Sequence, residues 1–272
     1  MSKQNLSGNR KRLTFSLTLF LVMIAAVACV NDLTPEGGWS GPVEEGGYLF
    51  IGNHDGSLVR FNPESGNLDS NWRYPDGDGL GAMYSKSVII GENIYNVGYT
   101  CSGDNCRAEV FGLNLADGSP IWGQNGLELN TKLVGSIGVS GETIFIGTTG
   151  IGEEEDGADG YFYAIDSATD ASSIVKWRIA LDSNSFSGVV VDGSTAYIGT
   201  MEGTLYAIDI SNIDDSANSE DRIKWTFDAE GAIAGPIHAE NGNLYFGDLA
   251  SNVYKLNASS RSGSSQISEV NS

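Results

Sequence analysis

A short apolar run that ends in glycine occurs five times along the chain. Measured from glycine to glycine, successive runs lie 46 to 52 residues apart. A period of this size, with loops absorbing its variation, is typical of propellers and other repeat arrays. The runs, each predicted to form a strand, are Tyr48–Gly52, Ile94–Gly98, Ile144–Gly147, Ala196–Gly199 and Leu244–Gly247.

The positions around each run follow a common order. A polar turn and a second apolar strand follow the glycine, and that strand closes on Asn or Asp, side chains that can cap the next turn through its backbone. A bend rich in Ser, Gly and Asp comes next. One more short apolar stretch precedes the run, for example at 88–90, 187–191 and 235–238. The closing residues are Asn62, Asn114, Asp166, Asp209 and Asn257.

Four short strands per repeat, joined by turns and without a helical period, describe one blade of a β-propeller. We therefore predict an all-β fold, a β-propeller of about five four-stranded blades, with no helix in the mature domain. In four repeats the bend is followed by a tryptophan, at Trp72, Trp122, Trp177 and Trp225.

The series of Asn or Asp, turn glycine and Trp resembles the repeat of pyrroloquinoline-quinone (PQQ)-type propellers, written roughly Ala-x-Asp-x-x-x-Gly-x-x-x-Trp. The best matches begin at Asn62 and Asn114, and the resemblance covers about residues 39 to 270. It implies that the four tryptophans pack between neighbouring blades, a role that suits their large apolar area.

The last repeat departs from this pattern. Ile267 stands where a tryptophan would fall, and residues 259–272 are rich in serine. This segment is either a disordered tail or a weak last strand. Trp39 lies only 13 residues before Gly52, so we place it at the entry to the first inner strand. The sequence leaves open whether five blades close on their own.

The N-terminus has the pattern of an export signal. Basic residues precede an uncharged, largely apolar run from Leu13 to Val30, as in secretory signals. The run ends in Ala26-Val27-Ala28-Cys29, which resembles a bacterial lipobox and implies acylation of Cys29 with chains such as palmitate. The alternatives are an ordinary signal peptide and an uncleaved membrane helix, since the run is close to transmembrane length.

This resemblance gives the expected domain organisation. Residues 1–28 are expected to be a signal peptide, 29–38 a tether, 39–258 the propeller, and 259–272 the tail or last strand. We expect the protein to be exported and anchored by lipid to the cell envelope membrane, at its periplasmic or extracellular face. Two or three acyl chains anchor a protein stably.

Removal of the signal would make the chain strongly acidic. It would take away four of the 15 basic residues and none of the 35 acidic ones. The remaining 11 basic residues give a net charge of −24. Nucleic acid and anionic lipid headgroups would be repelled, so neither is an expected partner.

Lipidation of Cys29 would leave an even pair of cysteines. Cys101 and Cys106 are separated by four turn-forming residues, so their Cα atoms can approach to disulfide distance. Export to an oxidising compartment then favours a disulfide between them. A metal site at this pair is not expected, because no His or third Cys lies nearby.

One loop offers a weak metal candidate. Residues 150–160, inside the third blade's central hairpin, supply hard oxygen ligands of the kind that calcium prefers. Their spacing fits no calcium-loop template, so the alternative reading, a solvated insertion, is preferred. The carboxylates concerned are Glu153, Glu154, Glu155, Asp156 and Asp159.

The sequence offers no clear catalytic group. His54 and His238 are the only histidines; His54 falls in a turn, and His238 in an inner strand, where a lone histidine is usually a hydrogen-bonded filler. Hydrolase and nucleotide-binding motifs do not occur. The resemblance extends to quinoprotein dehydrogenases, which hold PQQ and calcium in the ring centre, but these are roughly twice this length. No cofactor is therefore expected, neither PQQ nor calcium.

Three functions remain to be weighed. The sequence favours a protein-interaction or scaffolding module of the cell envelope, similar in kind to the BamB-like lipoproteins, over an enzyme. The partners would be envelope proteins, with the membrane contacted through the lipid. The alternatives are a small quinoprotein-type redox enzyme and a surface lectin or sensor domain. Fold analogy alone does not decide among them.

Overall fold

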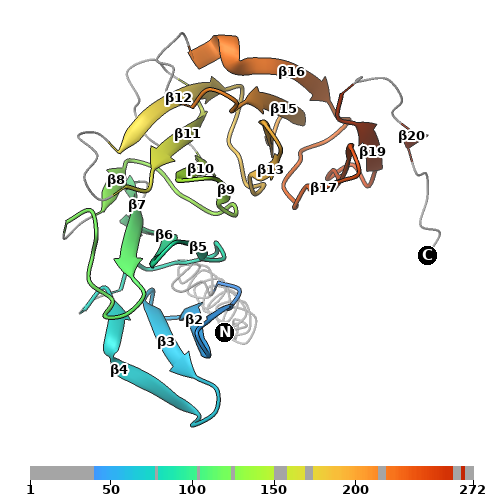
Figure 1. The fold of residues 1–272 in the computed structure, drawn as a ribbon. Coiled ribbons are helices and arrows are strands. Elements are labelled where there is room, and N and C mark those ends of the chain that lie inside the picture. Colours follow the sequence, from blue (N-terminus) through green and yellow to red (C-terminus); the bar gives the residue numbers. More distant parts are fainter. Residues whose placement is uncertain are drawn as a thin grey trace, which may run out of the picture. The chain divides into compact units, whose positions relative to one another are not determined.

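The described strands form five antiparallel sheets of four strands each, paired in chain order, as Figure 1 shows. The computed structural model describes residues 40–76, 79–102, 105–123, 126–149, 158–168, 174–213, 219–259 and 265–266. Each sheet corresponds to one predicted repeat. The predicted fold class, an all-β propeller of five four-stranded blades, is thereby confirmed.

The blades are numbered 1 to 5 along the chain. Blade 1 contains β1 (Val43–Glu45), β2 (Tyr48–Gly52), β3 (Leu58–Asn62) and β4 (Asn67–Tyr74). Blade 2 contains β5 (Val88–Ile90), β6 (Asn93–Ser102), β7 (Asn105–Asn114) and β8 (Leu127–Leu129). Blade 3 contains β9 (Gly138–Ser140), β10 (Thr143–Gly147), β11 (Gly160–Asp166) and β12 (Val175–Leu181).

The last two blades repeat this order. Blade 4 contains β13 (Val190–Asp192), β14 (Thr195–Gly199), β15 (Thr204–Asp209) and β16 (Ile223–Asp228). Blade 5 contains β17 (His238–Glu240), β18 (Asn243–Gly247), β19 (Val253–Asn257) and β20 (Ser265–Gln266). The fourth strand of blade 5, β20, has two residues and lies in the serine-rich segment. Of the two alternatives for this segment, the structure therefore has the weak last strand.

Helical structure is limited to one turn in the described part of the chain, the 3-10 helix η1 (Ser219–Arg222) before β16. None of the described segments forms a helix long and apolar enough to cross a membrane.

The inner strands begin later than the apolar pattern suggested. The stretches 187–191 and 235–238 were predicted as strands, whereas β13 starts at Val190 and β17 at His238. Val189 and Ile237 lie in the connections before these strands and are buried there. Their apolar character therefore reflects packing of the connection rather than strand formation.

The residue that closes each third strand caps the following turn, as predicted. The side-chain oxygen of Asn62 accepts the backbone N–H groups of Glu64 and Ser65. The corresponding oxygens of the other four blades each accept the N–H two residues further on. These bonds join Asn114 to Ala116, Asp166 to Ala168, Asp209 to Ser211 and Asn257 to Ser259.

Among the described residues the hydrophobic core consists of four clusters, each shared by two consecutive blades. They lie between blades 1 and 2, 2 and 3, 3 and 4, and 4 and 5. None of the four contains residues of both blade 5 and blade 1. Burial of apolar area between stacked sheets is the main stabilising contribution in such a fold.

Candidate interaction surfaces

Because the strands of each blade are antiparallel, the loops of the propeller lie on two opposite sides. In a blade of four consecutive antiparallel strands, the turns after the first and third strands lie at one end. The turn after the second strand lies at the other, together with the connection to the next blade. We call these the turn side and the connection side. The connections precede β5, β9, β13 and β17.

Backbone hydrogen bonds tie the loops of the connection side together. The Leu249 N–H, in the turn between β18 and β19, donates to the Ala232 carbonyl in the connection before β17, at 2.9 Å. The Met201 N–H makes the corresponding bond to Asn184 in blade 4, at 2.8 Å. In blades 4 and 5 the turn after the second strand is therefore held against the connection that precedes the blade.

Three exposed apolar side chains lie in loops of the connection side. Tyr84 and Phe186 come from the connections before β5 and β13, and Leu249 comes from the β18–β19 turn. They are 39%, 37% and 68% exposed. Contiguous exposed apolar patches mark interaction surfaces, and we take these three side chains as the candidate contact residues of this side.

The longest hairpin also projects from this side. β6 and β7 have ten residues each, and the Cys101–Cys106 disulfide joins a directly opposed pair near their tip. The Cα atoms of this pair are 4.1 Å apart, and the predicted disulfide is thereby confirmed. Tyr99, at the base of the extension, lies beside the exposed Tyr84, with ring centroids 6.3 Å apart.

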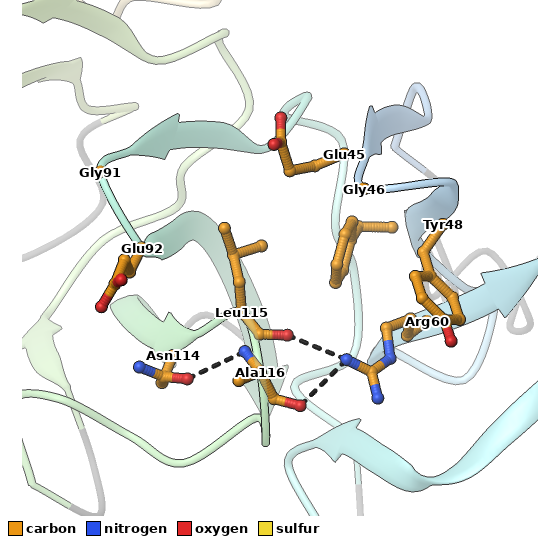
Figure 2. A pocket seen from close by; sticks show the side chains of 10 residues that line it. Glu45, Gly46, Tyr48, Arg60, Gly91, Glu92, Asn114, Leu115 and Ala116 are labelled. Atoms are coloured by element: carbon orange, nitrogen blue, oxygen red, sulfur yellow. Dashed lines mark hydrogen bonds between the residues drawn. The ribbon is translucent and has the colours of Figure 1, made fainter.

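A pocket of about 460 Å³ opens on the turn side between blades 1 and 2. Figure 2 shows Arg60 reaching across it to the carbonyl oxygens of Leu115 and Ala116, at 2.9 and 3.0 Å. The Arg60 guanidinium also lies over the Tyr48 ring and binds Asp69. Arg60 thus joins the two blades, and this use of its donors leaves little for a ligand.

A second pocket, of about 520 Å³, occupies the corresponding place between blades 3 and 4. Here Lys176 binds the Asp166 carboxylate at 2.7 Å. Burial alone would raise the pKa of Asp166, but the bonds from Lys176 and the Ala168 N–H lower it. Arg60, Lys176 and Asp166 are therefore already paired within the protein.

Three tryptophans donate hydrogen bonds across blade interfaces. Trp72 Nε1 donates to the carbonyl of Leu115 in blade 2, at 3.0 Å. Trp122 and Trp177 donate to carbonyls of the next blade, at Ala168 and Ile213. Trp225 is buried in the cluster between blades 4 and 5. The tryptophans therefore lie between neighbouring blades.

Two arginines extend this pattern, and sequence reasoning missed both. Arg60 lies over the Trp72 ring, 5.7 Å from its centroid, and Arg222 lies over the Trp177 ring at 4.4 Å. Arg222 donates to the carbonyls of Asp209 and Asn212 in the turn after β15. Arg60 lies on β3 and Arg222 ends the 3-10 helix η1, so the repeat pattern gave no signal for either.

A buried carboxylate was also missed. Glu109 on β7 is 6% exposed and accepts the Tyr74 hydroxyl of blade 1 at 2.5 Å. Burial raises the pKa of Glu109 above its usual range and outweighs the opposite effect of the Tyr74 hydrogen bond. The sequence did carry a signal for this residue. Glu109 is a charged residue within the apolar strand β7, and the neighbouring blades 1 and 3 cover that strand on both faces.

The remaining sequence candidates are not brought together. His54 lies exposed in the β2–β3 turn, and His238 is exposed on the innermost strand of blade 5. Asp159, the one described member of the acidic loop, is exposed. Cys29, the tether, Glu153, Glu154, Glu155 and Asp156 lie outside the described residues. No cluster of three metal-ligating side chains occurs within the described ranges.

Comparison with known proteins places this fold. Residues 106–213 match the family described as outer membrane protein assembly factor BamB. The crystal structure of BamB from Moraxella catarrhalis is similar, with 17% identity and a TM-score of 0.55 over 80% of this chain and 58% of that one. The chain thus spans little more than half of that relative's length. No curated protein matches the chain.

Two other solved structures share the architecture. Quinohemoprotein alcohol dehydrogenase from Comamonas testosteroni is 16% identical, with a TM-score of 0.59 over 86% of this chain and 43% of that one. A chain of the mitotic checkpoint complex is 10% identical, with a TM-score of 0.55 over 82% of this chain and 60% of that one. At such identities the likeness concerns the fold.

These findings identify the class of protein as a β-propeller. More particularly, residues 106–213 are similar to the BamB family, and the chain shares its PQQ-like-repeat propeller fold with BamB and with quinohemoprotein alcohol dehydrogenase. The predicted resemblance is confirmed.

Proposed function

We propose that this protein is a protein-interaction or scaffolding module of the cell envelope that binds its partners through the connection side. The observation that carries the proposal is the position of Tyr84, Phe186 and Leu249, exposed apolar residues from three blades on that one side. Burial of such side chains by a partner contributes roughly 25 cal/mol per Å² of apolar area. Propellers present broad, rigid surfaces of this kind.

The proposal includes export and lipid anchoring at Cys29, supported by the lipobox-like sequence and by the likeness to BamB. Mass spectrometry of the protein from its native membrane tests this point. We expect an acylated cysteine at the mature N-terminus, and Cys29→Ala should release the protein from the membrane fraction.

Site-specific photo-crosslinking tests the interaction surface. A photoreactive amino acid replaces Phe186 or Leu249 in the full chain, and irradiation is performed on intact cells. We expect adducts of defined mass that contain envelope proteins. Glu92 provides the control, because it is exposed and lies in the β5–β6 turn on the turn side.

Two outcomes would contradict the proposal. One is equal crosslinking from Phe186 and Glu92, which would show no preference for the connection side. The other is a quinone chromophore in the purified protein together with dye-linked alcohol oxidation. That result would support the redox alternative, with which the dehydrogenase likeness is compatible.

A further inference from the structure

Each blade turns one sheet face toward the next blade, and this forward face carries a matching row of three residues across its first three strands. In blades 1 to 4 the middle residue is an aromatic that is at most 3% exposed. Pairing defines the rows as Val43, Phe50, Arg60; Val88, Tyr95, Gly112; Gly138, Phe145, Ala164; Val190, Tyr197, Ala207; and His238, Tyr245, Lys255.

The forward face of blade 5 has the row but lacks a covering blade among the described residues. Tyr245 is only half-buried, and His238 and Val253 are exposed. The glycines that end the second strands of blades 4 and 5 show the same difference. A β-carbon on Gly199 would meet Ile233 of the next blade at 2.4 Å, whereas one on Gly247 would meet only Asn252 of its own blade.

The opposite, backward face of blade 1 is the second surface that no described blade covers. The backward row is the set of directly paired residues that the first three strands place on this face. In blades 2 to 5 its middle residue, on the second strand, is completely buried, at Ile94, Ile144, Ala196 and Leu244. In blade 1 this residue is Leu49, which is half-buried along with its cross-strand neighbour Phe61. Both surfaces therefore have the residue pattern of an interface between blades.

Each of the two terminal faces carries a charge in its row. The forward row of blade 5 ends in Lys255, where blades 2 to 4 have Gly or Ala. The backward row of blade 1 includes the exposed Glu44, where the other blades have Ile89, Val139, Val191 and Ala239. The positive charge of Lys255 on one face and the negative charge of Glu44 on the other are complementary.

Arg60 shows which contacts a positively charged side chain makes at the position that Lys255 occupies in blade 5. Arg60 occupies the same place in its row and donates to Leu115 and Ala116, in the β7–β8 turn of the next blade. The equivalent turn of blade 1 contains Pro63 and Glu64, which adds an exposed carboxylate. Lys255 already lies over the Tyr245 ring, 5.7 Å from its centroid, at this edge.

We propose that blade 5 of one copy binds the backward face of blade 1 of a second copy, with Lys255 directed toward Glu64 of that copy. The occupant is a second copy because the same chain supplies both halves of one interface, matched in row pattern and charge. The contact joins two different faces, so it is heterologous and forms a ring if the rotation closes, or an open chain if it does not. It is independent of partner binding on the connection side.

Cysteine crosslinking between two tagged forms of the full chain tests the contact. One form carries Phe61→Cys and the other Tyr245→Cys, and they are coexpressed and treated on membranes with a short bismaleimide. We expect a mixed dimer that contains both tags. Glu92→Cys replaces Phe61→Cys in the control, because Glu92 is exposed but lies in a turn of blade 2. No crosslink, or equal crosslinking with the control, would overturn the proposal.

A charge exchange provides the second measurement. Lys255→Glu or Glu64→Lys alone should reduce the mixed dimer about two- to fivefold, the range expected of a solvent-accessible ion pair. The two changes combined in one chain should restore it. Glu64 is exposed and Lys255 is only partly buried, so we expect the variants to fold. Failure of the combined variant to recover would contradict the proposed register.

Discussion

Trp72 and the carbonyl oxygen of Leu115 are joined by a hydrogen bond of 3.0 Å across the first blade interface. The same oxygen accepts a bond from Arg60. The Trp72 side chain is 1% exposed and also packs edge-on against Phe50. One tryptophan therefore combines apolar burial, ring packing and a polar bond between two blades.

Replacement of Trp72 by Ala should destabilise the protein by about 3–5 kcal/mol, the usual cost of removing a large buried aromatic. Trp122→Ala is the matched comparison, because Trp122 makes the same kind of bond but is only half-buried. We expect a smaller loss there, about 2 kcal/mol. Urea denaturation of both variants measures the difference, and equal losses would show that burial does not set the contribution.

Glu109 should make stability depend on pH. Because burial raises the pKa of Glu109 above 4.5 in the folded protein, the native state binds more protons than the unfolded state in the window above that pH. The free energy of unfolding therefore falls as pH rises through this window. Glu109→Gln should remove this decline, which thermal unfolding at a series of pH values would detect.

Tyr74→Phe is the control for that experiment. It leaves the buried Glu109 without the Tyr74 hydroxyl, so we expect a loss of about 1–3 kcal/mol, the cost of an unsatisfied buried polar group. The decline with pH should become steeper, because the Tyr74 bond favours the charged carboxylate. An unchanged pH profile in both variants would show that Glu109 does not titrate differently in the folded state.

Much of the fold was predictable because each repeat carries its own local signals. The alternation and the closing Asn or Asp are local properties, and the Asn62 and Asn114 turns form as expected. Strand starts were less predictable. Val189 and Ile237 are apolar because they pack between blades, and composition does not distinguish a buried connection from a strand.

The candidate surfaces were predictable only in part. The Cys101–Cys106 disulfide depends on a short spacing that the sequence displays, whereas Arg60 and Arg222 meet their carbonyl partners through tertiary packing. The exposure of Tyr84 and Phe186 was not predicted either. An aromatic in a connection gives no local sign of whether it points into the core or outward.

Removal of the disulfide should act locally. The bond closes a loop of six residues at a hairpin tip, so loop-closure entropy allows at most about 2 kcal/mol. We expect Cys101→Ser with Cys106→Ser to increase amide hydrogen exchange at the tip of β6 and β7 and to leave exchange in β10 and β14 unchanged. Faster exchange throughout the blades would show that the hairpin supports the whole fold.

A pair of glycine variants should separate covered from uncovered blade faces. Gly199→Ala would place a methyl group 2.4 Å from Cγ2 and 2.6 Å from Cβ of the fully buried Ile233. Since Ile233 cannot withdraw easily, we expect a loss of about 1–3 kcal/mol from overpacking. Gly247→Ala, at the same strand position of blade 5, meets no atom closer than 3.5 Å. It should therefore leave the free energy of unfolding of the dilute monomer within about 0.5 kcal/mol of the parent. Denaturation of both variants at low protein concentration measures this contrast, and a large loss for Gly247→Ala would show that this face of blade 5 is already covered within a single copy.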